Sequence, residues 1–307
     1  MSRLVEGAPA MDSEQPVSVV RDLSYLSGGV SAPNKGRLDL YLPRGVTRFP
    51  VIVSIHGGAL VEGDKSGQEF VGRRFAAAGI GTAVINYRLS PEVSHPAHVQ
   101  DVAAAFAWVK RFIGEFAGRA DSIFVIGHSA GAYLAALLAT DGSYLESHRL
   151  TFADIRGVVA VSGFYWVERV AQDRPKSVWG DDKRAWVEAS PPHYLGPTLP
   201  PMLLIYADGD EPARRRQNVD MAYAARSAGN DSVELVEVSG RDHRSLWSGL
   251  ERPATRSPSA SLPSCAAVSV WVSWRPFPWC PGVARSSPGA APSTLPRGSA
   301  VRPTPES

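Results

Sequence analysis

The feature that most constrains this chain is a serine placed between two glycines, directly after an apolar run and directly before an Ala/Leu-rich run. The stretch reads Phe124-Val-Ile-Gly-His-Ser-Ala-Gly-Ala-Tyr-Leu134. This pattern is typical of a strand–turn–helix in which the serine, Ser129, sits at a sharp turn. Such a turn strains the serine backbone, so its neighbours must be small, as Gly127 and Gly131 are. The alternative is that Ser129 only caps the helix, a common position for serine.

Other apolar runs predict a sheet around this turn. Runs rich in β-branched residues are expected of strands buried on both faces of a parallel sheet, and they cover residues 50–55, 81–87, 122–126, 155–162 and 201–207. Apolar and polar residues alternate in 17–26, 37–42 and 233–238, and the first two predict antiparallel strands with one solvent-exposed face. Helical patterns occupy 66–78, 97–116, 129–140 and 212–228. This alternation predicts an α/β fold, a mostly parallel sheet of about eight strands with helices on both faces.

The composition changes near residue 250. Eleven prolines, eleven serines, six arginines and both cysteines of the chain fall in its last 56 residues. We interpret residues 251–307 as a Pro/Ser/Arg-rich tail that is either disordered or a frame-shifted product replacing a native terminal helix. Residues 17–250 are expected to form one domain, with 1–16 as an N-terminal extension. Residues 163–200, rich in Trp, Pro and Asp, predict a cap-like insertion over one end of the sheet.

Charge and cysteine content exclude several classes of function. The formal net charge is +2, but the first 251 residues carry 26 basic and 29 acidic side chains, without a basic stripe for nucleic acid. Those residues contain no cysteine, which excludes a disulfide framework and a thiolate metal site there. We expect neither a metal nor a cofactor. No secretory or membrane-spanning segment is recognisable, so we expect a cytoplasmic protein without a membrane partner.

Two residues after Ser129 are placed to activate it. A serine nucleophile needs a base to take its proton and an acid to orient that base, in the chain order Ser, Asp or Glu, His. Asp210 follows the strand 201–207 and His243 follows the strand 233–238. Both are therefore expected on loops at the carboxyl ends of strands, the edge where Ser129 lies and where sites of open α/β sheets form. Asp208 and Glu211 compete with Asp210 for the role of acid.

Glycines after the strand 50–55 predict a site for negative charge. Attack on a carbonyl creates an oxyanion, which backbone N–H groups stabilise where the chain approaches closely. Gly57, Gly58 and Ala59 offer such a chain, and the amide of Ala130 is the second usual donor. Of the remaining histidines, His128 is expected to pack beside the turn. No catalytic role is predicted for His95, His98 and His193, which are expected in loops or at the start of a helix.

These motifs resemble those of the α/β-hydrolase superfamily, and more closely carboxylesterases related to hormone-sensitive lipase and to the feruloyl-esterase and arylformamidase branch. The matching segments are His56-Gly-Gly58, Asn86-Tyr-Arg-Leu-Ser-Pro91, Gly127-His-Ser-Ala-Gly131, 186–191 and Gly240-Arg-Asp-His243. The similarity covers about residues 17–247. It departs at Ala59, where the hormone-sensitive-lipase type has a third glycine. It departs again after residue 247, where the usual terminal helix is not recognisable.

The resemblance implies a cofactor-free serine carboxylesterase acting on small to medium esters. It implies Ser129 as nucleophile, Asp210 as acid and His243 as base, with N–H donors from Gly58, Ala59 and Ala130. Alternatives on the same scaffold are an arylformamidase, which hydrolyses N-formylkynurenine, and a feruloyl or acetyl-sugar esterase. A non-catalytic binding protein or a truncated inactive product is a further alternative. The acyl-chain length and the oligomeric state do not follow from the sequence.

Overall fold

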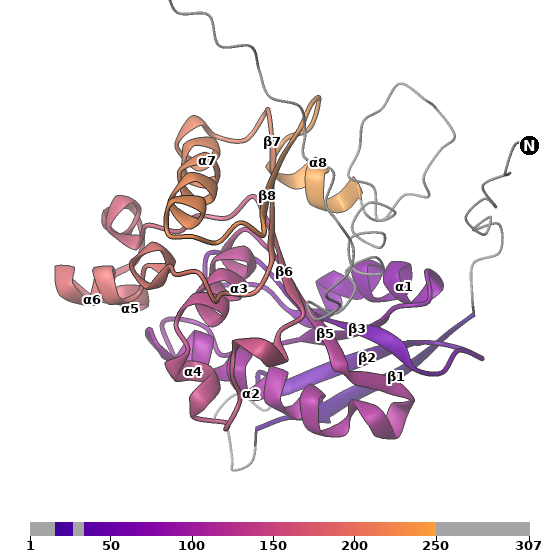
Figure 1. Ribbon diagram of the computed structural model, residues 1–307. Coiled ribbons are helices and arrows are strands. Elements are labelled where there is room, and N and C mark those ends of the chain that lie inside the picture. Colours follow the sequence, from indigo (N-terminus) through magenta and orange to yellow (C-terminus); the bar gives the residue numbers. More distant parts are fainter. Residues whose placement is uncertain (1–15, 27–33, 250–307) are drawn as a thin grey trace, which may run out of the picture. The chain divides into compact units, whose positions relative to one another are not determined.

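The computed structural model describes residues 16–26 and 34–249 (Figure 1). Within them the strands are β1 (Val17–Ser24), β2 (Arg37–Pro43), β3 (Phe49–Ile55), β4 (Gly81–Ile85), β5 (Gly118–His128), β6 (Gly157–Val161), β7 (Met202–Ala207) and β8 (Val233–Val238). The proposals for 1–15 and 251–307, the extension and the tail, lie outside the described residues.

The helices alternate with the strands from β3 onward. The α-helices are α1 (Glu69–Ala77), α2 (Ala97–Phe112), α3 (Ala130–Thr140), α4 (Ser143–Glu146), α5 (Lys176–Trp179), α6 (Lys183–Glu188), α7 (Pro212–Ser227) and α8 (His243–Ser248). Short 3-10 helices are η1 (Lys65–Gln68), η2 (Ile113–Phe116), η3 (Phe152–Asp154), η4 (Val167–Arg169), η5 (Ala171–Asp173) and η6 (Pro191–Tyr194). None of the helices in the described part of the chain has the length and apolar character needed to cross a bilayer.

The strands form one mixed sheet in the order β1-β2-β4-β3-β5-β6-β7-β8. β1 pairs antiparallel with β2, and β2 antiparallel with β4, whereas all pairs from β4 to β8 are parallel. The predicted fold class, a mostly parallel α/β sheet with helices on both faces, is confirmed. The parallel pairing brings the carboxyl ends of β3, β5, β6, β7 and β8 to one edge of the sheet.

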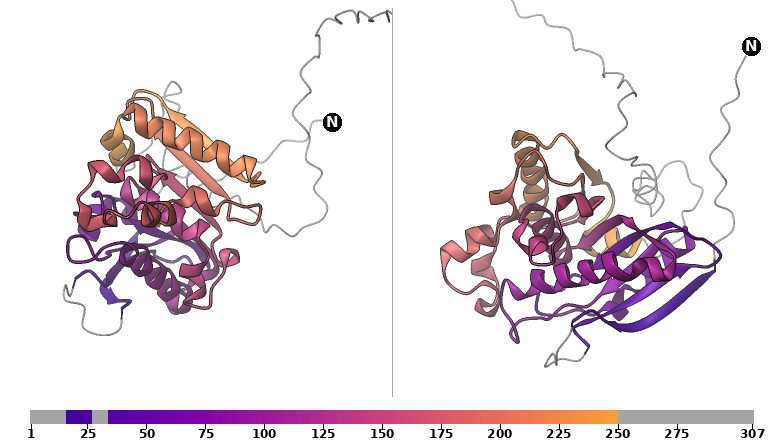
Figure 2. Two further views of the ribbon diagram at one scale, coloured as in Figure 1. Left: turned by 90° about the vertical axis from the view of Figure 1, so that its left-hand side faces the viewer. Right: turned by 60° about the horizontal axis from the view of Figure 1, so that its bottom comes forward.

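Both faces of the inner parallel strands β3, β4, β6 and β7 are buried, which explains their nearly continuous apolar runs. In β3, Val51 and Val53 belong to the apolar cluster that also contains residues of α2, α3 and α7. Ile52 points the other way, into a cluster with residues of α1 and α8. The left view of Figure 2 faces the side of α7 and of the helical segment between β6 and β7.

The expectation of a solvent-exposed face on residues 37–42 was wrong. Asp39 and Tyr41 have no exposed surface, because helices cover this face of β2. Tyr41 packs against Gly72 of α1, where an added β-carbon would lie 2.2 Å from the tyrosine ring. Asp39 is ion-paired with the buried Lys65. Asp39, a polar residue in an alternating strand, therefore belongs to a buried ion pair and not to a solvent-exposed face.

Candidate active site

Ser129 lies between the end of β5 and the start of α3, in a strained backbone conformation. Its φ is 57° and its ψ is −117°, a region that non-glycine residues rarely adopt. A β-carbon on Gly127 would lie 2.2 Å from the backbone of Gly131, and one on Gly131 would lie 2.2 Å from the carbonyl oxygen of Ile55. The two glycines are thus required by close packing, which holds the strained turn in place.

Asp210 is buried at the end of β7 and is hydrogen-bonded at both carboxylate oxygens. Oδ1 lies 2.8 Å from Nδ1 of His243. Oδ2 accepts from the hydroxyl of Ser162 at 2.5 Å and from the amide of Ala207 at 2.9 Å. Burial opposes ionisation, but the hydrogen bonds from His243, Ser162 and Ala207 outweigh it and lower the pKa of Asp210 below its ordinary value. Asp210 is therefore a carboxylate at neutral pH.

Asp208, the competing acid, has a different task. Its carboxylate accepts from the amide of Gly240 at 2.9 Å and of Arg241 at 3.3 Å. It thereby fixes the turn that leads from β8 to His243. Asp210 is the carboxylate in contact with His243, whereas the hydrogen bonds of Asp208 are with the backbone amides of Gly240 and Arg241.

His243 is the first residue of helix α8, whereas the sequence predicted it on a loop. Asp242 caps this helix, and its carboxylate accepts from the amides of Arg244 and Ser245. An aspartate directly before a short amphipathic run is a helix-start signal, so the cap was readable in the sequence. Because α8 begins at His243, the cap fixes the backbone from which the imidazole projects.

His128 lies beside the turn, as the sequence predicts, and forms a bridge to His243. Its Nε2–H donates to the carbonyl oxygen of His243 at 2.8 Å. Its ring stacks on Trp247 at 5.2 Å and lies 4.5 Å from the ring of His243. Burial, together with the neighbouring His243, lowers the pKa of His128 to about 3. His128 is therefore a neutral hydrogen-bond donor that connects the Ser129 turn to α8.

Ser129 and His243 are neighbours through His128 without a direct hydrogen bond. Among the described residues, Ser129 Oγ has no hydrogen-bond partner. Hydrogen bonds between nucleophile and base are commonly long without substrate and tighten when it binds. The hydrogen bond between Asp210 and His243 is formed. Within the described residues, no other protein group forms a hydrogen bond with Ser129 Oγ.

The loop after β3 carries Gly57, Gly58 and Ala59 to the same place. A β-carbon on Gly57 would lie 3.2 Å from Cβ of Ser129. Gly58 and Ala59 have φ values of 111° and 54°, and a side chain on Gly58 would collide with the carbonyl of Glu62. Within the described ranges, the amides of Gly58, Ala59 and Ala130 donate to no protein acceptor. Unpaired N–H groups next to a serine can bind a developing negative charge.

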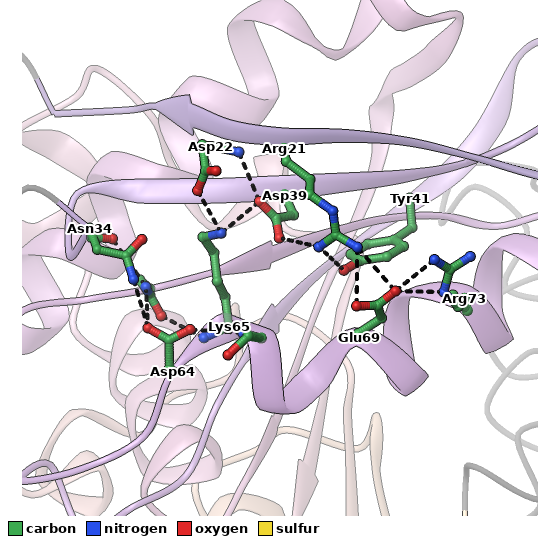
Figure 3. Close-up of polar contacts among 11 residues, drawn as sticks. Arg21, Asp22, Asn34, Asp39, Tyr41, Asp64, Lys65, Glu69 and Arg73 are labelled. Carbon is green, nitrogen blue, oxygen red and sulfur yellow. Dashed lines mark hydrogen bonds and ion pairs between the residues drawn. The ribbon is translucent and has the colours of Figure 1, made fainter.

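A network of charged and polar side chains, here called the Lys65 network, anchors this loop to the sheet (Figure 3). Lys65 Nζ lies 2.7 Å from Asp39 and 2.8 Å from Asp22. The Lys65 amide donates to Asn86 at 2.6 Å, and the Asn86 side chain donates to Asp64 at 2.9 Å. Burial disfavours the Lys65 cation, but its bonds to Asp22 and Asp39 outweigh this and raise its pKa.

Three residues of the site were missed by the sequence interpretation. Ser162 directly follows β6, at the same sheet edge, and that position was the available signal. Gln217 Oε1 accepts from the amides of Tyr165 and Trp166, which ties the segment after β6 to helix α7. Trp247 donates to Gln68 at 2.7 Å. No local pattern predicts the contacts of Gln217 or Trp247, because their partners lie far away in the chain.

The comparisons with known proteins agree with this architecture. Residues 38–224 match the family described as BD-FAE. Esterase LipQ of Mycobacterium tuberculosis is 28% identical over 211 residues, which cover 64% of this chain and 50% of LipQ. Isoprenylcysteine alpha-carbonyl methylesterase ICME of Arabidopsis thaliana is 27% identical over 234 residues, covering 69% and 55%. The chain therefore spans about half the length of these curated relatives.

Solved structures show the same fold at low identity. A truncated carbohydrate esterase from gut microbiota matches with a TM-score of 0.65 and 23% identity, covering 76% of this chain and 90% of that one. A phosphonate-inhibited esterase B from Lactobacillus rhamnosis matches with a TM-score of 0.65 and 22% identity, covering 76% and 81%. The expected family resemblance is confirmed: the chain belongs to the BD-FAE family and has the α/β-hydrolase fold.

Proposed function

We propose that this chain is a serine carboxylesterase that hydrolyses small to medium esters through Ser129, His243 and Asp210. The observation that carries the proposal is the 2.8 Å contact between Asp210 and His243 at the sheet edge that also holds the strained Ser129 turn. A serine, a base and an orienting carboxylate in this chain order are the arrangement of serine hydrolases with this turn.

In the proposed mechanism, Ser129 Oγ attacks the ester carbonyl carbon while Nε2 of His243 takes its proton. Asp210 holds Nδ1–H of the imidazole and stabilises the imidazolium that forms. The amides of Gly58, Ala59 and Ala130 donate to the oxyanion. His243 then protonates the leaving alcohol, and water attacks the acyl-enzyme with the same residues in reversed roles.

The names of the relatives favour hydrolysis of an ester bond over hydrolysis of the formamide bond that an arylformamidase cleaves. LipQ and ICME are described as an esterase and a methylesterase, and the structural neighbours as a carbohydrate esterase and an esterase. A carboxylic ester is what these descriptions share. Arylformamidase activity would use the same three residues, so formyl release from N-formylkynurenine, compared with ester turnover, separates the two. Feruloyl and acetyl-sugar esters belong in the same panel.

Turnover of 4-nitrophenyl butyrate by Ser129→Ala tests the assignment. We expect kcat to fall by about 10⁴-fold or more, because the nucleophile is lost. Ser147→Ala is the matched control, since Ser147 is exposed and donates only to the carbonyl of Tyr144. A fluorophosphonate should label the wild-type protein and the control but not Ser129→Ala. Unlabelled wild-type protein would instead indicate the non-catalytic alternative.

A further inference from the structure

A cavity lies beside the proposed active site, between helix α7 and the segment that follows β6. Its volume is about 370 Å³, and its lining includes Phe164, Arg174, Glu211 and Arg214. Arg214 donates to the carbonyl oxygen of Ser162 at 2.8 Å, and the hydroxyl of Ser162 donates to Asp210. Phe164 stacks on Tyr133 of α3, with ring centres 4.9 Å apart. The cavity thus adjoins both the proposed acid and the helix that begins after Ser129.

Two guanidinium groups at this cavity have no carboxylate partner among the described residues. Arg214 is partly buried, and its hydrogen bond goes to the neutral carbonyl of Ser162. Arg174 lies over the ring of Phe164, 5.6 Å from its centre. In the described part of the chain neither forms an ion pair. Arg169, which also lines the cavity, differs because it pairs with Asp220 at 2.7 Å.

The two unpaired arginines also repel each other. Burial lowers the pKa of Arg214 below its ordinary value, and the charge of Arg174 lowers it further, against the effect of Asp210 and Glu211. Asp173 and Glu211 border the cavity as well, but both are exposed, so water and salt screen their charges. An anion between Arg174 and Arg214 would relieve the repulsion and replace the lost hydration with charge-assisted hydrogen bonds.

We propose that this cavity binds a carboxylate carried by the ester substrate, held between Arg174 and Arg214. The inference rests on the proposed esterase function and names the substrate class for it: esters with a second, ionised carboxyl group. A planar guanidinium binds a carboxylate with two parallel hydrogen bonds, which a neutral substrate of equal length cannot form.

Two matched substrate pairs test the proposal. The acyl pair is mono-4-nitrophenyl adipate and 4-nitrophenyl hexanoate, and the alcohol pair is 4-carboxyphenyl butyrate and phenyl butyrate. The measured quantity is the ratio of kcat/KM for the anionic member to that for the neutral member. In at least one pair we expect this ratio to fall about ten-fold or more in Arg174→Gln and in Arg214→Gln. Arg184→Gln is the control, because Arg184 is exposed in the same segment and does not line the cavity.

A binding measurement separates failure of this proposal from failure of the esterase function. Ser129→Ala protein is titrated calorimetrically with methyl hydrogen adipate, and binding should be lost when Arg174→Gln is added. Ester turnover with ratios unchanged in both arginine variants would overturn the carboxylate site alone. Absence of ester turnover and of fluorophosphonate labelling would overturn the esterase function. Calorimetry would then still decide the carboxylate site, since absent binding, or binding unaffected by Arg174→Gln, refutes it.

Discussion

The two segments that flank the Ser129 turn, the loop after β3 and the start of helix α8, are held by different kinds of contact. The loop with Gly57, Gly58 and Ala59 is anchored by the Lys65 network, whose Lys65 and Asp39 are 6% and 0% exposed. The His243 side is anchored by stacked rings, with His128 between His243 and Trp247. Removing one partner of a buried ion pair leaves a buried charge with less compensation. A stacked aromatic side chain, in contrast, can be replaced by successively smaller side chains. A single substitution in the Lys65 network should therefore cause a large loss of stability, whereas substitutions in the stacked rings should cause small, graded losses.

The largest effect is expected at the contact between Asp210 and His243. Asp210→Asn keeps the shape of the side chain but no longer favours the imidazole tautomer that accepts the serine proton. We expect kcat for 4-nitrophenyl butyrate to fall by about 10⁴-fold, with little change in folding.

Asp208→Asn is the matched comparison for Asp210→Asn. Asp208 contacts only the backbone of Gly240 and Arg241, so its loss should reduce kcat far less. Equal losses in the two variants would contradict the assignment of Asp210 as the orienting acid.

The Lys65 network should show the largest loss of stability. Lys65→Met leaves the buried Asp39 with only the longer, 3.3 Å contact to the partly exposed Arg21 among its described ion pairs. We expect the free energy of unfolding to fall by about 3 kcal/mol, measured by urea denaturation. Lys176→Met is the control, because Lys176 pairs with Asp181 at 2.9 Å while both remain exposed. That pair should contribute no resolvable stability. Similar losses in the two variants would refute a special role for burial.

The double variant Lys65→Met with Asp39→Asn sharpens the same point. Removing the buried negative charge together with its partner should restore part of the lost stability, since the desolvated charge is then absent. Asp39 also accepts hydrogen bonds from Arg21 at 3.3 Å and from the amide of Asp22 at 2.8 Å. A double variant less stable than the sum of the single losses would show that these two hydrogen bonds outweigh the ion pair.

Acid should weaken both sides, because each contains a buried neutral histidine. Burial lowers the pKa of His56 to about 4, and burial with the neighbouring His243 lowers that of His128 to about 3. Unfolded histidines bind protons below about pH 6.5. The stabilisation is therefore complete above that pH and is lost as the pH falls from there through the folded values. Between pH 7 and pH 5, the contribution of each histidine to the free energy of unfolding should fall by roughly 2 kcal/mol.

His128→Phe isolates the contribution of the ring-held side. The phenyl ring retains the stack on Trp247 but cannot titrate, so the difference in unfolding free energy between pH 7 and pH 5 should shrink by roughly 2 kcal/mol. The other buried histidines titrate in both proteins, and their contribution cancels in this comparison. An unchanged pH difference in His128→Phe would contradict a neutral His128 in the folded state.

Much of the fold was predictable, because the strands of a parallel sheet require apolar runs and their order follows from alternation with helices. The bounds of β7 and α7 agree with the predicted segments within one residue at each end. β5 begins at Gly118, earlier than predicted, because Gly118 pairs with Phe49 ahead of the apolar run. Local apolarity does not report such pairing.

The site was predictable where chemistry imposes a chain order and a sheet edge, as for Ser129, Asp210 and His243. It was not predictable where partners meet only through packing. Asp39 reads as an exposed position in an alternating strand, and its burial is explained by contacts with Lys65, Arg21 and the amide of Asp22. Arg174 and Arg214 are forty residues apart, and nothing in either neighbourhood indicates that they share a cavity.

The smallest effect should come from Trp247, and it tests whether rings or hydrogen bonds hold the His243 side. Trp247→Phe loses the N–H that donates to Gln68 but keeps a ring over His128, which should reduce stability by about 1 kcal/mol and leave kcat nearly unchanged. Trp247→Leu removes the ring as well, so His128 and the carbonyl of His243 that it binds lose support. We expect kcat to fall in the leucine variant with KM unaltered. If Phe and Leu variants lose kcat equally, the hydrogen bond to Gln68, not the stack, positions His243.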